Sequence, residues 1–240
     1  MMFGFFQKLG PAVLTVAALL SNGADAWAGE LKLSTVRIEL NDKQSSTALI
    51  VSNVGETDTL VHFRVMSWGQ AEAQDVLSPT QDVMVNPPMA TIAAGQKQMI
   101  RIGYKGNLQQ QTERTYRLFV EEVPHQNRER VQAVETYLKI SLPVFVAPLA
   151  KTESRLSGVI DRTPAGQPVL RLHNASGSHV RLVSYTLSTP GRWQGEKQTG
   201  LHYVLPGATM ALPLPADARI SGATTVELLT DAGVVAVPLK

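Results

Sequence analysis

The sequence predicts an all-β protein made of two antiparallel β-sandwich domains. Short segments with alternating apolar and polar residues fill most of the chain, and turn-forming pairs such as Asn41-Asp42 and Ala94-Gly95 separate them. The same pattern starts again after the proline-bearing stretch APLAKTES (147–154). No segment keeps a period of 3.6 residues for long enough to indicate a helix.

The N-terminal segment is typical of a secretory signal peptide. Lys8 precedes the apolar run LGPAVLTVAALL, and Ala26-Trp27-Ala28 has the small-x-small form of a cleavage site. The apolar run is too short to span a bilayer comfortably. We therefore expect residues 1–28 to be removed, which leaves an exported protein with no membrane insertion.

The composition limits the class of protein further. The 240 residues carry a formal net charge of +2 and include no Cys. A charge this small does not indicate nucleic-acid binding. An exported chain without Cys cannot use disulfides, so each domain needs an adequate hydrophobic core of its own.

The first domain is expected to span residues 29–148. Its alternating segments, each expected to form a strand, lie at 31–40, 46–54, 59–68, 96–104, 115–123 and 134–142. Polar stretches lie at 69–75, 105–113 and 124–130. We expect these stretches to be solvated loops.

The second domain is expected to span residues 149–240, after a short, stiff hinge. Its alternating segments lie at 154–161, 168–174, 179–188, 201–207, 209–215 and 224–239. The last segment contains Asp231-Ala232-Gly233, where Gly can supply a positive φ. A hairpin turn is therefore expected there.

The sequence gives no support for an enzyme, a metal site or a cofactor. The five His residues are scattered without metal-ligand spacing, and no nucleophile-elbow, zinc-protease or phosphate-loop motif occurs. The adjacent Glu121 and Glu122 would point to opposite faces of a strand, which excludes an acid/base pair.

Basic residues lie between apolar neighbours within several of the predicted strands. They are Arg37, Arg101, Arg117 and Lys139. The simpler interpretation of each is a charge on the solvent face of a half-buried strand. A cleft between two domains could, however, gather two of them, and a partly desolvated cationic pair would bind a carboxylate well.

The segment LKISLPVFVAP (138–148) has the pattern of a strand with one apolar face. The apolar face carries Leu138, Ile140 and Leu142, and the other face carries Lys139 and Ser141. Pro143 and Pro148 have no backbone N–H. Pairing along one edge of this strand should therefore end where the two domains meet.

Together these segments resemble the PapD-like periplasmic chaperones of the chaperone–usher pathway. The resemblance runs from about residue 31 to residue 239, and it rests on STVRIEL, VNPPMATIAAGQKQMIRI, YRLFVEEVP, LKISLPVFVAP and VLRLHNASGSHVRLVSYTL. The form SLPVFVAP, in place of an ending with aromatic-Arg-Pro, is most similar to the archaic branch of the family.

The resemblance implies two immunoglobulin-like sandwiches set at an angle, with a cleft between them. It implies a periplasmic, non-enzymatic chaperone that completes the fold of pilus (fimbrial) subunits by donor-strand complementation and delivers them to an outer-membrane usher. On this basis Val134, Thr136, Leu138 and Ile140 would face the groove of the subunit.

In that family a basic pair in the cleft binds the C-terminal carboxylate of the subunit. Arg37 matches the position of the family's Arg, whereas the position of its Lys partner falls on Pro143. Lys139, the nearest basic residue on that strand, is therefore the expected partner, with Arg101 and Arg117 in reserve. Better-known members have an Arg at the hinge that pairs with acidic residues, but this chain has Ala147 there.

Two other functions remain open at this point. A structural pilus subunit would have one incomplete sandwich and a donating N-terminal extension. A two-domain periplasmic adhesion or binding module would show clustered aromatic residues on loops, and the three Trp residues do not cluster in the sequence. The identity of the subunits and possible self-association of the free protein also stay open.

Overall fold

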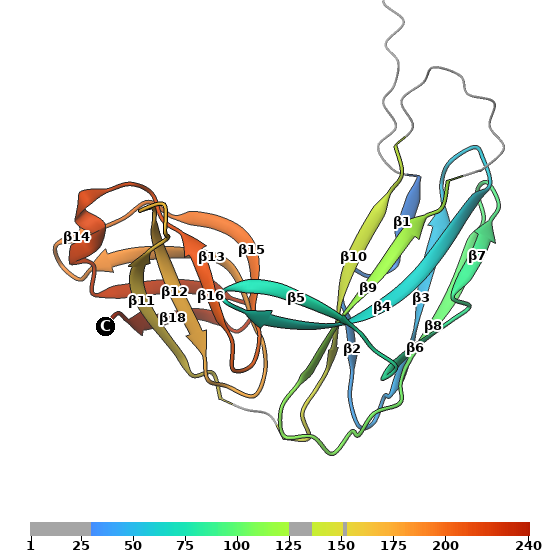
Figure 1. Cartoon of the computed structure of the whole chain (residues 1–240), viewed down its shortest axis with the longest axis horizontal. Helices are drawn as coiled ribbons and strands as arrows, with labels where there is room; N and C mark the ends of the chain where they lie inside the picture. The colour runs from blue at the N-terminus through green and yellow to red at the C-terminus, as the bar shows by residue number, and fades with distance from the viewer. Residues whose placement is uncertain (1–29, 125–135, 151–152) are drawn as a thin grey trace, which may run out of the picture.

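The computed structural model describes residues 30–124, 136–150 and 153–240. Two β-sandwiches lie at an angle to each other, as Figure 1 shows. The predicted fold class, two immunoglobulin-like sandwiches, is confirmed. The expected signal peptide lies outside the described residues, and the expected domain boundary after residue 148 stays a prediction.

The first sandwich packs two sheets against each other. One sheet has the strand order β1 (Leu31–Leu33), β3 (Ser46–Asn53), β8 (Lys97–Tyr104), β6 (Val83–Asn86). The other has the order β2 (Ile38–Leu40), β10 (Lys139–Val146), β9 (Arg114–Glu122), β4 (Thr59–Ala71), β5 (Gln74–Pro79), and β7 (Met89–Ile92) also pairs with β4. All of these pairings are antiparallel except that between β2 and β10.

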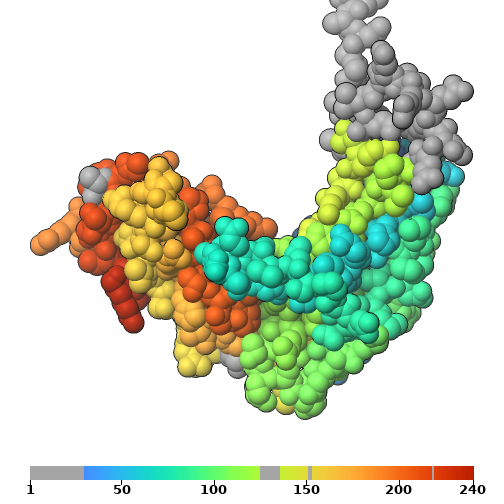
Figure 2. Space-filling view, viewed as in Figure 1, coloured from blue at the N-terminus to red at the C-terminus, as the bar shows by residue number. Residues whose placement is uncertain are grey.

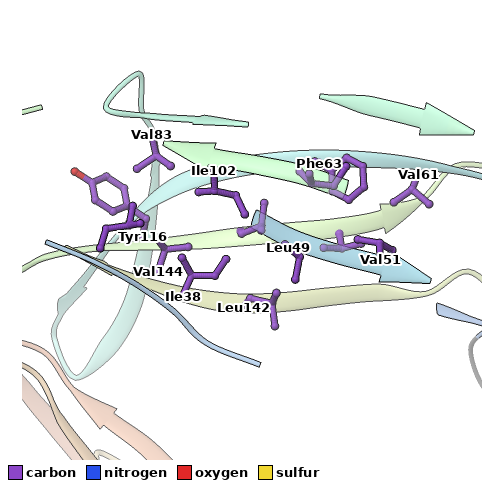
Figure 3. Packing of buried hydrophobic residues seen from close by; sticks show 14 of the residues in the cluster. Ile38, Leu49, Val51, Val61, Phe63, Val83, Ile102, Tyr116, Leu142 and Val144 are labelled. Atoms are coloured by element: carbon purple, nitrogen blue, oxygen red, sulfur yellow. The ribbon is translucent and has the colours of Figure 1, made fainter. Parts of the chain in front are cut away.

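The core of this sandwich lies between its two sheets. Alternate residues of each strand point inward, as the period of two predicts, and Figure 3 shows Leu49 and Ile102 of one sheet facing Leu142 and Val144 of the other. All four of these side chains are buried.

The segment expected as one strand at residues 31–40 forms two strands that belong to different sheets. β1 pairs with β3, whereas β2 pairs with β10. Between them the Ser34 N–H donates to the Ile50 carbonyl oxygen at 3.0 Å, and the Thr35 hydroxyl donates to the Arg37 carbonyl oxygen at 2.7 Å. These local bonds satisfy the backbone where the chain crosses from one sheet to the other, a crossing that the alternating pattern does not reveal.

The polar stretch at residues 69–75 is not the loop that the sequence suggests. β4 and β5 continue through it as a hairpin, with Ala71 opposite Gln74. Its two turn residues, Glu72 and Ala73, have φ values of 51° and 62°. Every residue of β5 is exposed, so the strand lacks the apolar alternation that would have predicted it.

We expect that changing Glu72-Ala73 to Asn-Gly will stabilise the protein by about 1 kcal/mol. A two-residue hairpin with both φ values positive favours Asn-Gly, and residues other than Gly, Asn and Asp are strained in this region. Thermal unfolding measures the gain. The same substitution by Val-Val, which is β-branched, should lower the melting temperature.

The second sandwich is also antiparallel. One sheet has the order β11 (Leu156–Arg162), β12 (Pro168–Asn174), β16 (Thr209–Pro213). The other has the order β14 (Trp193–Gln194), β13 (Val180–Thr189), β17 (Thr225–Thr230), β18 (Gly233–Pro238), with β15 (Gln198–Val204) also paired to β13 and a short 3-10 helix η1 (Ala218–Gly222) before β17. Thr230 pairs with Gly233, whose φ is 110°, so the predicted hairpin turn at Asp231-Ala232-Gly233 is confirmed.

Candidate functional site

A cleft of about 870 Å³ lies between the two domains. Figure 2 shows the hollow that separates them on one side of the molecule. The first domain contributes Arg37, Arg117 and residues 140–143 to the cleft lining, and the second domain contributes Arg181, Tyr203 and Asp231. Three Arg side chains from three different strands or strand ends therefore meet in one cleft.

Arg37 precedes β2 and donates from two of its nitrogen atoms. Its Nε lies 2.9 Å from Oε1 of Glu39, and its Nη1 lies 2.8 Å from Oδ2 of Asp231. About a third of the Arg37 side chain is exposed. The guanidinium is thus fixed in place and still open to the cleft.

Asp231 of the second domain accepts from two Arg side chains at once. Its Oδ2 accepts from Arg37 and its Oδ1 accepts from Nη1 of Arg181. Burial of the carboxylate opposes ionisation, but the hydrogen bonds from Arg181 and Arg37 outweigh it, so the pKa of Asp231 is lowered. Asp231 therefore carries its negative charge at neutral pH.

Arg117 lies on β9, opposite Pro143 of β10. Its guanidinium stacks 3.6 Å from the ring centroid of Trp68, and one of its nitrogen atoms lies 3.7 Å from Oδ2 of Asp75. Burial lowers the pKa of Arg117, and Asp75 partly offsets this effect. A guanidinium pKa starts so high that Arg117 remains charged.

Lys139 lies on β10 but does not line the cleft. It is four residues, or about 13 Å of strand, away from Pro143, the residue that the β2–β10 register places beside Arg37. Its ammonium group lies 2.8 Å from Oε1 of Glu121 and 4.9 Å from the ring centroid of Phe119.

The other reserve candidate, Arg101, is exposed on β8, in the opposite sheet of the first sandwich. The structure thus brings Arg117, rather than Lys139 or Arg101, into the cleft with Arg37.

β10 has one edge that is only partly paired. It pairs with β9 from Lys139 to Val146, but β2 covers the other edge only from Val144 to Val146. No other strand among the described residues pairs with the Lys139–Pro143 part of that edge.

Two backbone hydrogen bonds define which residues face this open edge. The Leu138 carbonyl oxygen accepts from Glu122 of β9 at 2.9 Å, and the Ala147 N–H donates to Leu40 of β2 at 2.8 Å. Since the direction of the backbone groups alternates along a strand, Lys139 and Ser141 present their N–H and C=O groups to the open edge. Pro143, which has no N–H to offer, stands where β2 takes over.

The even-numbered side chains of β10 point into the sandwich, and their exposure increases toward the open end. Leu142 is 3% exposed, whereas Ile140 and Leu138 are half-buried and pack against the edge of the core. Thr136, before the strand, is exposed, and Val134 lies outside the described residues. The apolar ridge expected from the sequence is therefore partly covered by the protein's own core.

An aromatic cluster joins the two domains. It consists of Trp68 and Phe145 from the first domain and Tyr203, Leu205 and Ala208 from the second. The ring of Phe145 lies 5.5 Å from that of Tyr203, and it stacks on His179 at 3.7 Å. Ala147 carries no charge that could form an ion pair at this joint, and the aromatic cluster supplies contacts between the two domains.

Polar contacts support the same joint. Oε1 of Glu113 lies 2.8 Å from Nδ1 of His179 and accepts from the His179 backbone N–H at 3.1 Å. The β4–β5 hairpin contacts the second domain as well. The Gln70 side chain donates from Nε2 to the Tyr203 carbonyl oxygen at 2.8 Å, and its Oε1 accepts from the Leu205 N–H at 3.0 Å. In Figure 1 the turn between β4 and β5 lies beside β16, and Ala73 forms a β-bridge with Met210 there.

Among the described residues, no group of three or more His, Asp or Glu side chains is arranged to hold a metal ion. They also contain no helix with the length and apolar character needed to cross a membrane.

Solved structures share the fold of this chain. The chain is 23% identical to a matched chain in the CsuC–CsuE chaperone–tip adhesion subunit pre-assembly complex from the archaic chaperone–usher Csu pili of Acinetobacter baumannii, with a TM-score of 0.71 and coverage of 88% of this chain and 100% of the other. A chain from the Salmonella enterica SafA pilin–SafB chaperone complex matches at 22% identity and a TM-score of 0.60, with coverage of 87% and 96%. The fold is therefore that of the two-domain pilus chaperones.

The sequence itself identifies the family. Residues 30–151 match the family model of the pili and flagellar-assembly chaperones, PapD N-terminal domain, and the chain belongs to this family. No curated protein matches the chain. Because the family consists of chaperones and not of enzymes, the expectation that the protein is not an enzyme is confirmed.

The residues that the second domain brings to the cleft are not among the candidates that the sequence predicts. Arg181, Tyr203 and Asp231 line it. Arg181 has the same signal as the four basic residues singled out earlier, a charge between apolar neighbours in a strand pattern. No local sequence pattern indicates that the strand carrying Arg181 faces the first domain.

Proposed function

We propose that the protein is a periplasmic chaperone that binds pilus subunits along the open edge of β10, anchors their C-terminal carboxylate at Arg37, and delivers them to an outer-membrane usher. The observation that carries the proposal is the Lys139–Pro143 edge of β10, which no strand of the described residues covers and which leads directly to the Arg-lined cleft. The TM-score of 0.71 to the Csu complex supports membership of the archaic branch.

The edge offers both parts of donor-strand complementation. The backbone groups of Lys139 and Ser141 can extend a ladder to a strand of the subunit. The half-buried Ile140 and Leu138 lie at the rim of the core, so a subunit placed at this edge would cover their exposed parts. Each well-buried aliphatic side chain contributes about 1.5–3 kcal/mol, although only the area newly covered counts here.

Anchoring of the terminal carboxylate would set the register of the subunit strand along β10. An Arg can bind a carboxylate with two parallel hydrogen bonds, and Arg37 lies beside Pro143, where the open edge ends. A terminal carboxylate held there would fix how far the subunit strand extends along β10. The shared cleft lining favours Arg117 over Lys139 as the second cation near this carboxylate.

We expect Arg37→Ala to reduce the recovery of bound subunits about tenfold or more. A hydrogen bond to a charged group contributes about 1.5–3 kcal/mol, and about 1.4 kcal/mol corresponds to a factor of ten. The measurement is co-purification of a tagged chaperone from periplasm after co-expression with pilus subunits of the same organism, with the bound proteins identified by mass spectrometry.

The matched control is Arg101→Ala, which removes an exposed Arg from a strand in the opposite sheet. It should leave recovery unchanged. If Arg37→Ala recovers as much subunit as the unaltered protein, Arg37 is not the anchor. If the unaltered protein binds no pilus subunit at all, the proposed function itself is wrong.

A further inference from the structure

The cleft already contains a carboxylate bound in the manner expected of a subunit terminus. Asp231 accepts from Nη1 of Arg37, at 2.8 Å, and from Nη1 of Arg181 through its other oxygen. Two guanidinium groups from different domains thus share one carboxylate.

We infer that Asp231 is an internal ligand that occupies the anchoring site of the free chaperone, and that Arg181 joins Arg37 in holding the subunit's terminal carboxylate once Asp231 has moved away. The inference rests on the proposed function of Arg37. The new elements are Arg181, an anchor from the second domain, and Asp231, a carboxylate of the chain itself that competes with the subunit terminus.

The position of Asp231 allows it to leave without loss of strand pairing. It is the first residue of the two-residue turn between β17 and β18, and the ladder ends at Thr230 and Gly233 on either side of it. Its side chain is 40% exposed. Rotation of this side chain toward solvent would break two ion pairs and no backbone bond of the hairpin.

The charges of the cleft favour exchange of one carboxylate for another. Its lining carries the cations Arg37, Arg117 and Arg181 and the anions Glu39 and Asp231. A second carboxylate beside Asp231 would repel it, whereas a carboxylate that replaces Asp231 leaves the charge balance as it was. Competition is therefore favoured over simultaneous binding at the same two guanidinium groups.

If Asp231 had a purely structural role, its loss would change carboxylate binding in the opposite direction. If Asp231 only oriented Arg37 and Arg181 for the subunit, its loss would weaken carboxylate binding. If Asp231 competes, its loss strengthens that binding, and only for ligands that end in a free carboxylate.

The test uses two fluorescent synthetic peptides of alternating Val and Ser, identical except that one ends in a free carboxylate and the other in an amide. Binding to the full chaperone is measured by fluorescence anisotropy. Asp231→Asn should tighten binding of the carboxylate peptide about two- to fivefold, the range expected for partly exposed ion pairs, and should leave the amide peptide unchanged.

Arg181→Gln is measured in the Asp231→Asn background, where it no longer has Asp231 to hold. It should still weaken binding of the carboxylate peptide. Matched controls are Asp161→Asn and Arg171→Gln, which break a comparable exposed ion pair elsewhere in the second domain and should change neither peptide. Thermal unfolding verifies that each variant folds.

Unchanged or weaker carboxylate binding in Asp231→Asn, or no preference of this variant for carboxylate over amide, would overturn the internal-ligand inference. An Arg181→Gln change without effect in that background would remove Arg181 as an anchor. Failure of the proposed function is distinguishable, because then Arg37→Ala would bind the carboxylate peptide as well as the unaltered protein does.

Discussion

Replacing Ile140 by Asp is expected to abolish the recovery of pilus subunits while the chaperone remains folded. Ile140 is half-buried at the open edge of β10 and lines the cleft. In the free protein an Asp there can turn toward water. In a complex it would be buried among apolar side chains without a partner, and burial of an unpaired charge costs several kcal/mol.

Co-purification from periplasm measures the effect, and circular dichroism verifies the fold. The matched control is Val159→Asp, which places the same charge on an exposed, 40% accessible aliphatic position of β11 in the second domain. Normal subunit recovery by Ile140→Asp would show that this face of β10 does not enter the subunit groove.

The second large effect concerns the joint between the domains. Phe145→Ala should lower the free energy of unfolding by about 3–5 kcal/mol, the usual cost of truncating a buried aromatic ring. Phe145 is 2% exposed and contacts aromatic rings from both domains. Since its partners Tyr203 and His179 belong to the second domain, we also expect the angle between the domains to become variable.

Urea unfolding gives the change in stability, and small-angle X-ray scattering reports the spread of domain arrangements. Leu170→Ala, a fully buried position inside the second sandwich, is the control. It should destabilise the protein without a change in scattering. A Phe145→Ala protein with the scattering of the unaltered one would contradict the role of the aromatic cluster in orientation.

Local patterns were sufficient to predict the fold class and many of the strands. The alternation in residues 115–123 matches β9, and the Asp231-Ala232-Gly233 turn lies where the sequence places it. Both depend on neighbouring residues only. The hairpin at Glu72-Ala73 was missed because neither turn residue is Gly, Asn or Asp, and because β5 buries no face.

The site was less accessible to prediction, because it depends on strand order and on the second domain. The expected partner of Arg37 was Lys139, the nearest basic residue along the strand. In the folded sheet Arg117 is closer to Arg37 than Lys139 is, because Arg117 pairs with Pro143, the residue of β10 that lies beside Arg37. Arg181 reaches the same cleft from a different domain, which no spacing within the first domain could indicate.

β4 has 13 residues, a length of about 40 Å. Its start, at Val61 and Phe63, belongs to the first core, Trp68 belongs to the interdomain cluster, and Gln70 bonds the second domain. One continuous strand therefore packs in the first core at its start and contacts the second domain at its end. Because β4 pairs with β9 and β9 pairs with β10, the strand that meets the second domain and the strand with the open edge are two ladders apart in the same sheet.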